Sequence, residues 1–488
     1  MAIAPPRGVS LEELRFDNTF AALGETFREA RIPDGVPGSR LVACSRDAAS
    51  LIDLRPGEEA RPEFAALVSG NALVRGMEPV AAIYGGHQFG VWAGQLGDGR
   101  AILLGEVRTA NGDAWELQLK GGGKTAFSRF ADGRAVIRST VREFLASEAM
   151  DALGVPTTRA LAMSAGDEPV LRETVERAAT VLRMAPSFVR FGSFEIFHYR
   201  KQHAEVKALA DYVIDRFFAA CGHGDDRYAR FFATVVERTA ELMAHWQAVG
   251  FAHGVMNTDN FSILGLTLDY GPYGFVEVYE PGFICNHTDE TGRYAFDRQP
   301  TIGLWNCYAL AEALSSLIAK GDLEAGLARY EPAYRAKFME LARAKLGFSG
   351  ARDGDADLVL ALMQMLEARR TDWTNFSRAL SHGDAEALAV LGDDATSRGW
   401  LALCAMRVQD DPRGDAGRRA AMRAVNPKYV LRNWVAQQAI EACEAGDDSV
   451  VRDVLAVLRA PYDEHADHED WAQPAPAKYA NLSVSCSS

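Results

Sequence analysis

The chain of 488 residues contains 48% hydrophobic and 24% charged residues, a globular composition that excludes disordered and fibrous proteins. Its length exceeds what one hydrophobic core normally supports, so two or three domains are expected. The formal charge of -14 argues against a general binder of nucleic acids or anionic membranes, because such proteins need a cationic surface.

The beginning of the chain and its cysteines suggest a cellular location. The sequence has neither a basic segment followed by an apolar core nor a run of about 18 apolar residues, so we expect a soluble cytoplasmic protein that does not enter membranes. The seven cysteines are scattered and never spaced C-x-x-C. This pattern predicts neither a zinc site nor a secreted disulfide framework.

After a loop-rich start, the chain predicts strands. Two apolar runs surround glycines and the dipeptide Asp98-Gly99, which favours a β-hairpin. Residues 115–120 alternate apolar and polar side chains, as a third strand would, and a glycine cluster follows them. Residues 134–153 then have helical periodicity.

The second half of the chain predicts mainly helices. Apolar residues recur at spacings of three and four over residues 203–249, 308–346 and 355–371, whereas residues 250–300 are rich in loops. A strand-rich part followed by a helical part predicts an α+β protein in two lobes. The expected divisions are an N-terminal extension (1–75), a strand-rich lobe (76–200), a helical lobe (201–425) and a C-terminal extension (426–488).

The stretch HGVMNTDN, residues 253–260, is similar to a protein-kinase catalytic loop. In the kinase pattern H-R-D-x-x-x-x-N, the Asp accepts the proton of the attacking hydroxyl and the Asn holds a metal ion. His253 and Asn260 have the right spacing, but Val255 replaces the Asp. A valine cannot accept a proton, so the match indicates lost chemistry, altered chemistry or chance.

Further residues stand in the order of a kinase nucleotide site. The hairpin glycines would let backbone N–H groups approach a phosphate. Lys120 would place a positive charge on that phosphate, and Glu143 on the next helix would hold the ammonium group as an ion pair. Asn260 and Asp269 would supply oxygen ligands to Mg²⁺. Each feature alone has a simpler explanation, such as a turn or a solvated side chain, but their order favours a nucleotide site.

Two histidines invite a metal or catalytic interpretation. Neither His87 nor His253 has a second His or Cys at ligand spacing. We interpret both as structural residues that form hydrogen bonds.

Four runs of sequence resemble the selenoprotein O family: YGGHQFGVWAGQLGDGRA, ELQLKGGGKTAFSRFADGRAVIRSTVREFL, HGVMNTDNFSILGLTLDYGPYGF and NPKYVLRNW. The resemblance extends from about residue 10 to the terminal CSS. Members of that family have a protein-kinase-like fold but transfer AMP from ATP to protein hydroxyls. They bind ATP flipped relative to ordinary kinases, so that the α-phosphorus faces the acceptor and pyrophosphate leaves. The resemblance implies a protein adenylyltransferase that uses ATP with Mg²⁺ or Mn²⁺.

The resemblance also implies roles for individual residues. Asp259 would be the general base, and Asn260 and Asp269 would bind the metal ion. The residues matched to nucleotide contacts are Gly97, Gly99, Arg100, Lys120, Asp132, Gly133, Arg183, Arg190 and Asp269. Two of these, Arg183 and Arg190, have a simpler interpretation, because two arginines on a strand usually face solvent.

Spacing alone leaves the reaction open. A kinase-like phosphotransferase would use the same site with ATP in the ordinary orientation, and a catalytically silent scaffold would only bind nucleotide. The expected partners are protein substrates with acceptor hydroxyls, with redox-related proteins among the candidates. Their identity, the choice among Ser, Thr and Tyr, the choice of metal and the oligomeric state cannot be read from the sequence.

One cysteine near the C-terminus corresponds to a selenocysteine in some members of the resembled family. This residue, Cys486, lies in a polar tail, where a thiol is accessible to oxidants. We hypothesise a reversible disulfide between Cys486 and Cys285, which lies where kinases keep their activation segment. The simpler alternative is a free thiol.

Overall fold

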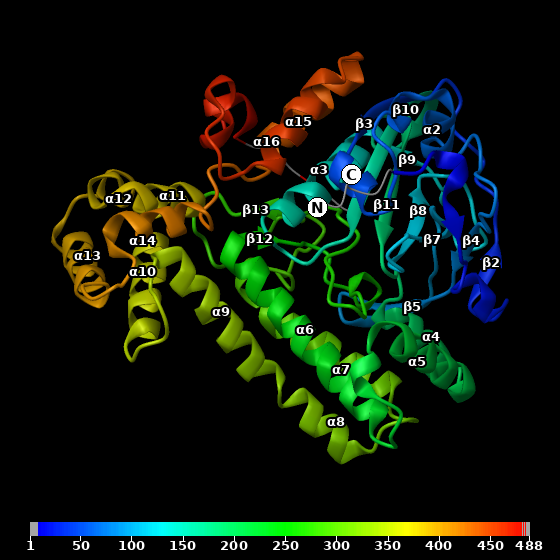
Figure 1. The fold of residues 1–488 in the computed structure, drawn as a ribbon, viewed down its shortest axis with the longest axis horizontal. Coiled ribbons are helices and arrows are strands. Elements are labelled where there is room, and N and C mark those ends of the chain that lie inside the picture. The colour runs from blue at the N-terminus through cyan, green and yellow to red at the C-terminus, as the bar shows by residue number, and fades with distance from the viewer. Residues whose placement is uncertain (1–7, 481, 483, 485–488) are drawn as a thin grey trace, which may run out of the picture.

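The computed structural model describes residues 8–480, 482 and 484. An antiparallel sheet and its covering helices form the first part of the chain, and helices dominate the remainder (Figure 1). This arrangement confirms the predicted α+β class. No helix in the described residues has the length and apolarity needed to cross a membrane.

The main sheet has nine strands with the order β2-β4-β7-β8-β11-β10-β3, and β1 and β9 pair with β7 and β11. Its strand pairs are antiparallel. The bounds are β1 (Arg15–Phe16), β2 (Arg28–Ala30), β3 (Arg40–Cys44), β4 (Val80–Ala82), β7 (Ala101–Arg108), β8 (Ala114–Lys120), β9 (Ala135–Val136), β10 (Arg159–Leu171) and β11 (Val175–Ala185). Two small sheets pair β5 (Gly85–Gln88) with β6 (Val91–Gln95), and β12 (Phe251–Ala252) with β13 (Gly274–Phe275).

The expected hairpin turn at Asp98-Gly99 is wrong in position. The tight turn instead joins β5 and β6, whereas Asp98-Gly99 connects β6 to β7, which belongs to a different sheet. Asp98 is buried there, and its carboxylate accepts hydrogen bonds from the Ala82 amide and the Gln118 side chain. Gly97 and Gly99 therefore lie in a connecting loop rather than at the tip of a hairpin.

Helices cover both faces of the main sheet. The bounds of these helices are α1 (Arg46–Ser50), α2 (Pro62–Val68) and α3 (Ile137–Ala152). Phe64 and Leu67 of α2 form one apolar cluster with Leu117 and Leu119 of β8. Val141, Phe144 and Leu145 of α3 belong to a second cluster that continues into the helical part. The helix predicted over residues 134–153 is confirmed as α3.

The helical part begins after β11. Its helices are α4 (Phe191–Tyr199), α5 (His203–Phe217), α6 (Arg227–Val249), α7 (Gln299–Ala313), α8 (Lys320–Leu327), α9 (Tyr330–Leu346), α10 (Asp355–Arg369), α11 (Trp373–His382), α12 (Asp384–Leu391), α13 (Ala395–Arg407) and α14 (Gly414–Arg423). The long helix α6 packs against α7, α8 and α9. Between α6 and α7, residues 250–298 are mainly loops, as expected.

The last two helices, α15 (Asn433–Ala445) and α16 (Ser449–Arg459), return to the strand-rich part (Figure 1). Both pack against α3, and α16 also contacts β3. Ion pairs reinforce this contact: Arg459 lies 2.7 Å from Asp151 of α3, and Arg40 of β3 lies 2.8 Å from Asp448. The helix that carries Glu143 is thus covered by the end of the chain.

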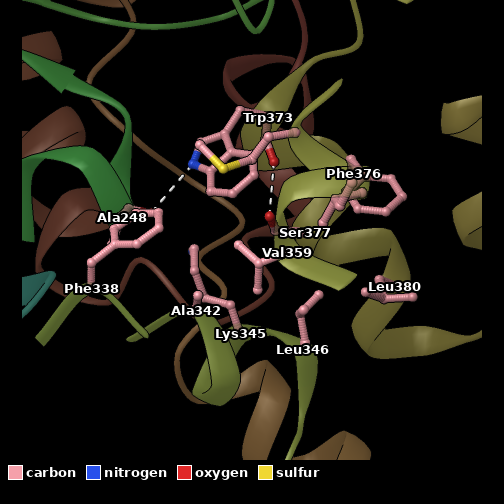
Figure 2. A pocket seen from close by; sticks show the side chains of 12 residues that line it. Ala248, Phe338, Ala342, Lys345, Leu346, Val359, Trp373, Phe376, Ser377 and Leu380 are labelled. Carbon is pink, nitrogen blue, oxygen red and sulfur yellow. Dashed lines mark hydrogen bonds between the residues drawn. The ribbon is translucent and has the colours of Figure 1, made fainter. Parts of the chain in front are cut away.

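A narrow apolar pocket lies between α9, α10 and α11 (Figure 2). Figure 2 shows Phe338, Lys345 and Leu346 on one side of it and Trp373 and Phe376 on another. Its volume is about 20 Å³, close to the space for one water molecule. Burial lowers the pKa of Lys345 to about 8. The pocket belongs to the interior packing of the helical part and is too small for a nucleotide.

Candidate nucleotide-binding site

A much larger cavity, of about 770 Å³, lies where the main sheet meets the loops of residues 250–272. Polar and charged groups from both parts of the chain converge on it. The predicted site residues that line it are Gly97, Gly99, Arg100, Lys120, Asp132, Gly133, Arg183, Asp259, Asn260 and Asp269. Residues separated by up to 172 positions therefore surround one space.

Two predicted residues, Glu143 and Arg190, lie behind the lining. Lys120 ends β8, and its ammonium group is 2.5 Å from the Glu143 carboxylate of α3. Burial lowers the pKa of Lys120, and the carboxylates of Glu143 and Asp269 oppose this shift. Glu143 is only 3% exposed, so it is not a surface residue of its helix.

The Asp269 carboxylate is the centre of a buried charge cluster. One oxygen lies 2.5 Å from Arg183 and 3.7 Å from Lys120, and the other lies 2.7 Å from Arg190. Burial alone would raise the pKa of Asp269, but Arg183, Arg190 and Lys120 hold it well below the usual value. Asp269 also has a φ of 59°, a left-handed conformation that is rare outside glycine and often found at functional sites.

The two arginines do not face solvent. Both are 2% exposed, and Arg183 also bonds to Glu143 at 2.8 Å. Arg190 donates to the backbone carbonyl of Asp259 at 2.8 Å, and its guanidinium lies 4.5 Å from the centre of the Tyr84 ring. Arg190 therefore joins the carboxylate of Asp269 to the segment that carries Asp259.

Asp259 has the environment expected of a proton acceptor. It lies in a short 3-10 turn, Thr258–Asn260, and is 8% exposed. Burial raises the pKa of Asp259 to about 7, although the charge of Arg190 opposes the shift. One carboxylate oxygen accepts a hydrogen bond from Gln88 at 3.5 Å, and the other has no partner among the described residues. A side chain at Gly86 would meet that oxygen at 2.7 Å, so glycine keeps the space beside it open.

The remaining residues of the HGVMNTDN stretch position this turn. The Nδ2 of Asn260 donates to the Val255 carbonyl at 3.0 Å, which leaves Oδ1 of Asn260 for a cation. His253 bonds the Leu268 carbonyl and the Val255 amide at 3.0 and 3.3 Å. His87 contacts the Glu195 carboxylate at 2.5 Å. Both histidines thus form the hydrogen bonds that we expected of structural residues.

The glycine-rich insert, residues 121–134, forms a wall of the cavity. The Gly123 amide donates to the Gly133 carbonyl at 3.1 Å, and a side chain at Gly133 would meet Gly123 at 2.2 Å. At the rim, Asp132 forms an ion pair with Arg172 at 2.7 Å. This hydrogen bond to Arg172 lowers the pKa of Asp132.

Sequence reasoning missed three residues at this site: Tyr84, Gln88 and Arg172. Tyr84 and Gln88 lie in the YGGHQFG run that carried the family resemblance, but only the folded chain brings them to Arg190 and Asp259. No sequence pattern pointed to Arg172, because its partner Asp132 lies 40 positions away along the chain.

Of the two cysteines in the expected redox pair, Cys285 lies in the part of the chain that the structure describes. Cys285 is 6% exposed, and its thiol donates to the Ala252 carbonyl at 3.4 Å. Cys486 lies outside the described residues. The amide of His287 donates to the carbonyl of Val484 at 3.1 Å, so residue 484 lies beside the loop that carries Cys285.

Comparisons with known proteins identify the family. The profile described as "Protein adenylyltransferase SelO" matches residues 10–459. The chain belongs to this family. Relatives called "Protein nucleotidyltransferase YdiU" are 53% identical in Myxococcus xanthus, 50% in Azotobacter vinelandii and 50% in Thioalkalivibrio sulfidiphilus. Each alignment covers 98% of this chain and 99–100% of the relative. The expected selenoprotein O relationship and protein adenylyltransferase activity are confirmed.

The charge cluster gives a stability prediction. Asp269→Asn should lower the free energy of unfolding by about 3–5 kcal/mol, because it leaves three buried cations without their shared carboxylate. Since the folded pKa of Asp269 lies below its ordinary value of 3.8, this stabilisation is present above that pH and is lost only as the pH falls through the folded pKa. Urea denaturation of the variant and the wild type at pH 7 measures the difference in their free energies of unfolding.

Asp393→Asn is the control, because Asp393 pairs with Arg398 on the exposed surface and its loss should change stability little. Equal stability of Asp269→Asn and the wild type would contradict the role of Asp269.

Proposed function

We propose that this adenylyltransferase moves AMP from ATP to Ser, Thr or Tyr hydroxyl groups of proteins, with release of pyrophosphate. The observation that carries the proposal is Asp259: a buried carboxylate with a pKa of about 7 and an oxygen without a hydrogen-bond partner among the described residues. It faces the cavity that the Lys120 and Arg183 cations also line.

The charges of the cavity suit the phosphates of ATP. In the buried cluster beside the cavity, Lys120, Arg183 and Arg190 carry three positive charges and Glu143 and Asp269 carry two negative charges, so these five side chains have one positive charge in excess. An anionic ligand would therefore be favoured there. Gly97, Gly99, Arg100 and the Asp132-Gly133 pair line the rest of the proposed nucleotide site.

The oxygen ligands for Mg²⁺ or Mn²⁺ would come from Asn260 and Asp269. The donor set fits a hard cation, which takes one or two protein oxygens and completes its shell with phosphates and water. The described residues contain no cluster of three or more His, Cys, Asp or Glu side chains suited to a metal. When bound, such a cation neutralises phosphate charge.

Asp259 would accept the proton of the acceptor hydroxyl. In the proposed step the hydroxyl oxygen forms a bond to the α-phosphorus, the bond from that phosphorus to the bridging oxygen breaks, and pyrophosphate leaves. The proton moves to Asp259, whose pKa of about 7 suits a base at neutral pH. Val255 cannot perform this role, so the proposal moves it to the carboxylate four residues later.

We also propose that the two parts of the chain are the lobes of a protein-kinase-like fold. Support comes from the Lys120–Glu143 ion pair between a strand and a helix, and from the Asn260 and Asp269 loops across the cavity. In this assignment residues 76–200 and 201–425 form the two lobes. Residues 8–75 add β1, β2 and β3 to the sheet of the first lobe, and residues after 425 add α15 and α16 against it.

The first prediction for the reaction distinguishes AMP transfer from phosphoryl transfer. Purified enzyme given ATP labelled at the α-phosphate should attach label to protein, whereas ATP labelled at the γ-phosphate should not. Label is measured on the protein after denaturing gel electrophoresis. Transfer of γ label would indicate a phosphotransferase, and transfer of neither label would indicate a scaffold that only binds nucleotide.

The second prediction concerns the base. Asp259→Asn should lower kcat by about 10²–10⁴ with little change in ATP affinity, because the base acts on the acceptor proton. Wild-type kcat/KM should rise with pH through an apparent pKa near 7 as Asp259 loses its proton, and the variant should lack this step.

Asp289→Asn is a matched control for the base. Asp289 is also buried, but both of its carboxylate oxygens accept hydrogen bonds, from the backbone amides of Arg293 and Tyr294. This variant should lower stability and keep the wild-type pH profile. If Asp259→Asn weakened ATP binding as much as it slowed turnover, Asp259 would belong to the metal or nucleotide site instead.

The third prediction concerns regulation. We propose that Cys285 and Cys486 form a reversible disulfide on oxidation by hydrogen peroxide: the S–S bond forms, the O–O bond breaks, the two thiols give up two electrons, and their two protons leave in two molecules of water. Mild oxidation should lower the transfer activity, and peptide mapping without reductant should then find this cross-link. Dithiothreitol should restore the activity. Cys285→Ala should abolish both effects, whereas Cys443→Ala, a buried cysteine beside Asp448, should retain them. Absence of the cross-link would refute the switch.

A further inference from the structure

The hairpin of β5 and β6 lies directly against the candidate general base. It forms a two-stranded sheet apart from the main sheet and packs beside α4 (Figure 1). Its Gln88 lines the nucleotide cavity and donates to the Asp259 carboxylate at 3.5 Å. The hairpin is therefore continuous with the place where an acceptor hydroxyl must arrive.

Several contacts hold the hairpin in place. The His87 amide donates to Thr258 Oγ1 at 2.7 Å. The Phe89 amide bonds Asn257 Oδ1 at 3.1 Å and the Tyr294 hydroxyl at 2.9 Å. One edge of the hairpin is thus fixed to the segment that carries Asp259.

The turn between the strands determines which groups lie on which side. Phe89 and Gly90 have φ angles of 50° and 84°, the type I′ conformation of two-residue hairpins. Gln88 and Val91 flank this turn as a directly opposed pair. Directly opposed residues project to the same face of a sheet, so Val91 lies on the face from which Gln88 reaches Asp259.

The opposite edge of the hairpin is open. In a two-residue hairpin the flanking pair exchanges both ladder hydrogen bonds, so the next pair, His87 and Trp92, directs its backbone groups outward. The His87 amide shows this orientation in its bond to Thr258. Among the described residues, β6 has β5 as its one strand partner. The outer edge of β6 can therefore accept another strand.

The side chains on this hairpin are unusually apolar for a surface. Val91 is 70% exposed and Phe89 is 36% exposed. Nearby, the Arg293 guanidinium lies 3.0 Å from the position that a side chain at Gly90 would occupy and 4.8 Å from the Trp305 ring. The hairpin thus presents the exposed side chain of Val91 beside the cavity, together with the unpaired outer edge of β6.

We infer that the β5–β6 hairpin docks the acceptor protein, by pairing β6 with an extended segment whose apolar side chain packs on Val91. The inference rests on the proposed function, because it needs a protein hydroxyl at Asp259. Strand addition supplies affinity through backbone hydrogen bonds, and side-chain contacts supply the preference. Since Val91 is one cross-strand neighbour from Gln88, the preferred apolar residue lies within a few residues of the hydroxyl. The acceptors are accordingly extended segments with a Val, Ile or Leu close to the modified Ser, Thr or Tyr.

Synthetic peptides test this docking. Each carries one acceptor hydroxyl residue and, at neighbouring positions, valine, aspartate or lysine. With α-labelled ATP, the wild type should give about tenfold higher kcat/KM for the valine peptides, which is the effect of burying one such side chain. Val91→Asp should remove this preference, leave ATP affinity unchanged and favour the lysine peptides.

Val175→Asp is the matched control, because Val175 is 71% exposed on the β10–β11 hairpin. It should behave as the wild type with every peptide. Equal kcat/KM for all flanking residues, or identical behaviour of Val91→Asp and Val175→Asp, would overturn the docking surface while AMP transfer stands. If Val91→Asp only abolished a dimer found by size-exclusion chromatography, the hairpin would bind a second copy instead. If the wild type transferred no α label to any peptide or protein, the proposed function and the docking would both fall.

Discussion

Three cationic side chains form ion pairs with one buried carboxylate, that of Asp269, and these ion pairs hold the candidate site together. Asp269 contacts Lys120 at the end of β8, Arg183 within β11 and Arg190 before α4. A single side chain therefore connects the sheet, the start of the helical part and the loop that contains Asp269. Because the cluster is buried, loss of one member leaves uncompensated charge, and such losses are costly. The same cluster also contains a surplus of positive charge, so the interaction that joins the two parts also prepares the cavity for an anion.

Much of the site could be predicted from the sequence because its residues are carried by regular elements. The alternating pattern of residues 115–120 placed Lys120 at a strand end, and the periodicity after residue 134 placed Glu143 on a helix. The pattern could not say that Arg183 and Arg190 turn inward. A strand arginine can face either side of a sheet, and its partner Asp269 lies about 80 positions along the chain. Burial of Asp259, which raises its pKa, is likewise a property of the folded chain.

The first 75 residues were the hardest part of the fold to predict. Their strands β1, β2 and β3 have two to five residues each, too few for a clear alternation. They become strands only by pairing with β7, β4 and β10, which come later in the chain. The position of the tight turn was also unpredictable, since Asp98-Gly99 has the composition of a hairpin turn but is held in a connection by the hydrogen bonds of the Asp98 side chain.

The packing of α15 and α16 against α3 has a consequence for biosynthesis. A ribosome produces the sheet and α3 first, and the two helices that cover α3 begin at residue 433, which is 281 residues after α3 ends at residue 152. Until then the face of α3 that meets them lacks its cover, although Glu143 on the same helix pairs with Lys120 of the candidate nucleotide site. Domains usually fold as they leave the ribosome, from the N-terminus onward. Here α3 can complete its packing only after α15 and α16 have been synthesised, and by then every residue that lines the candidate site has already left the ribosome.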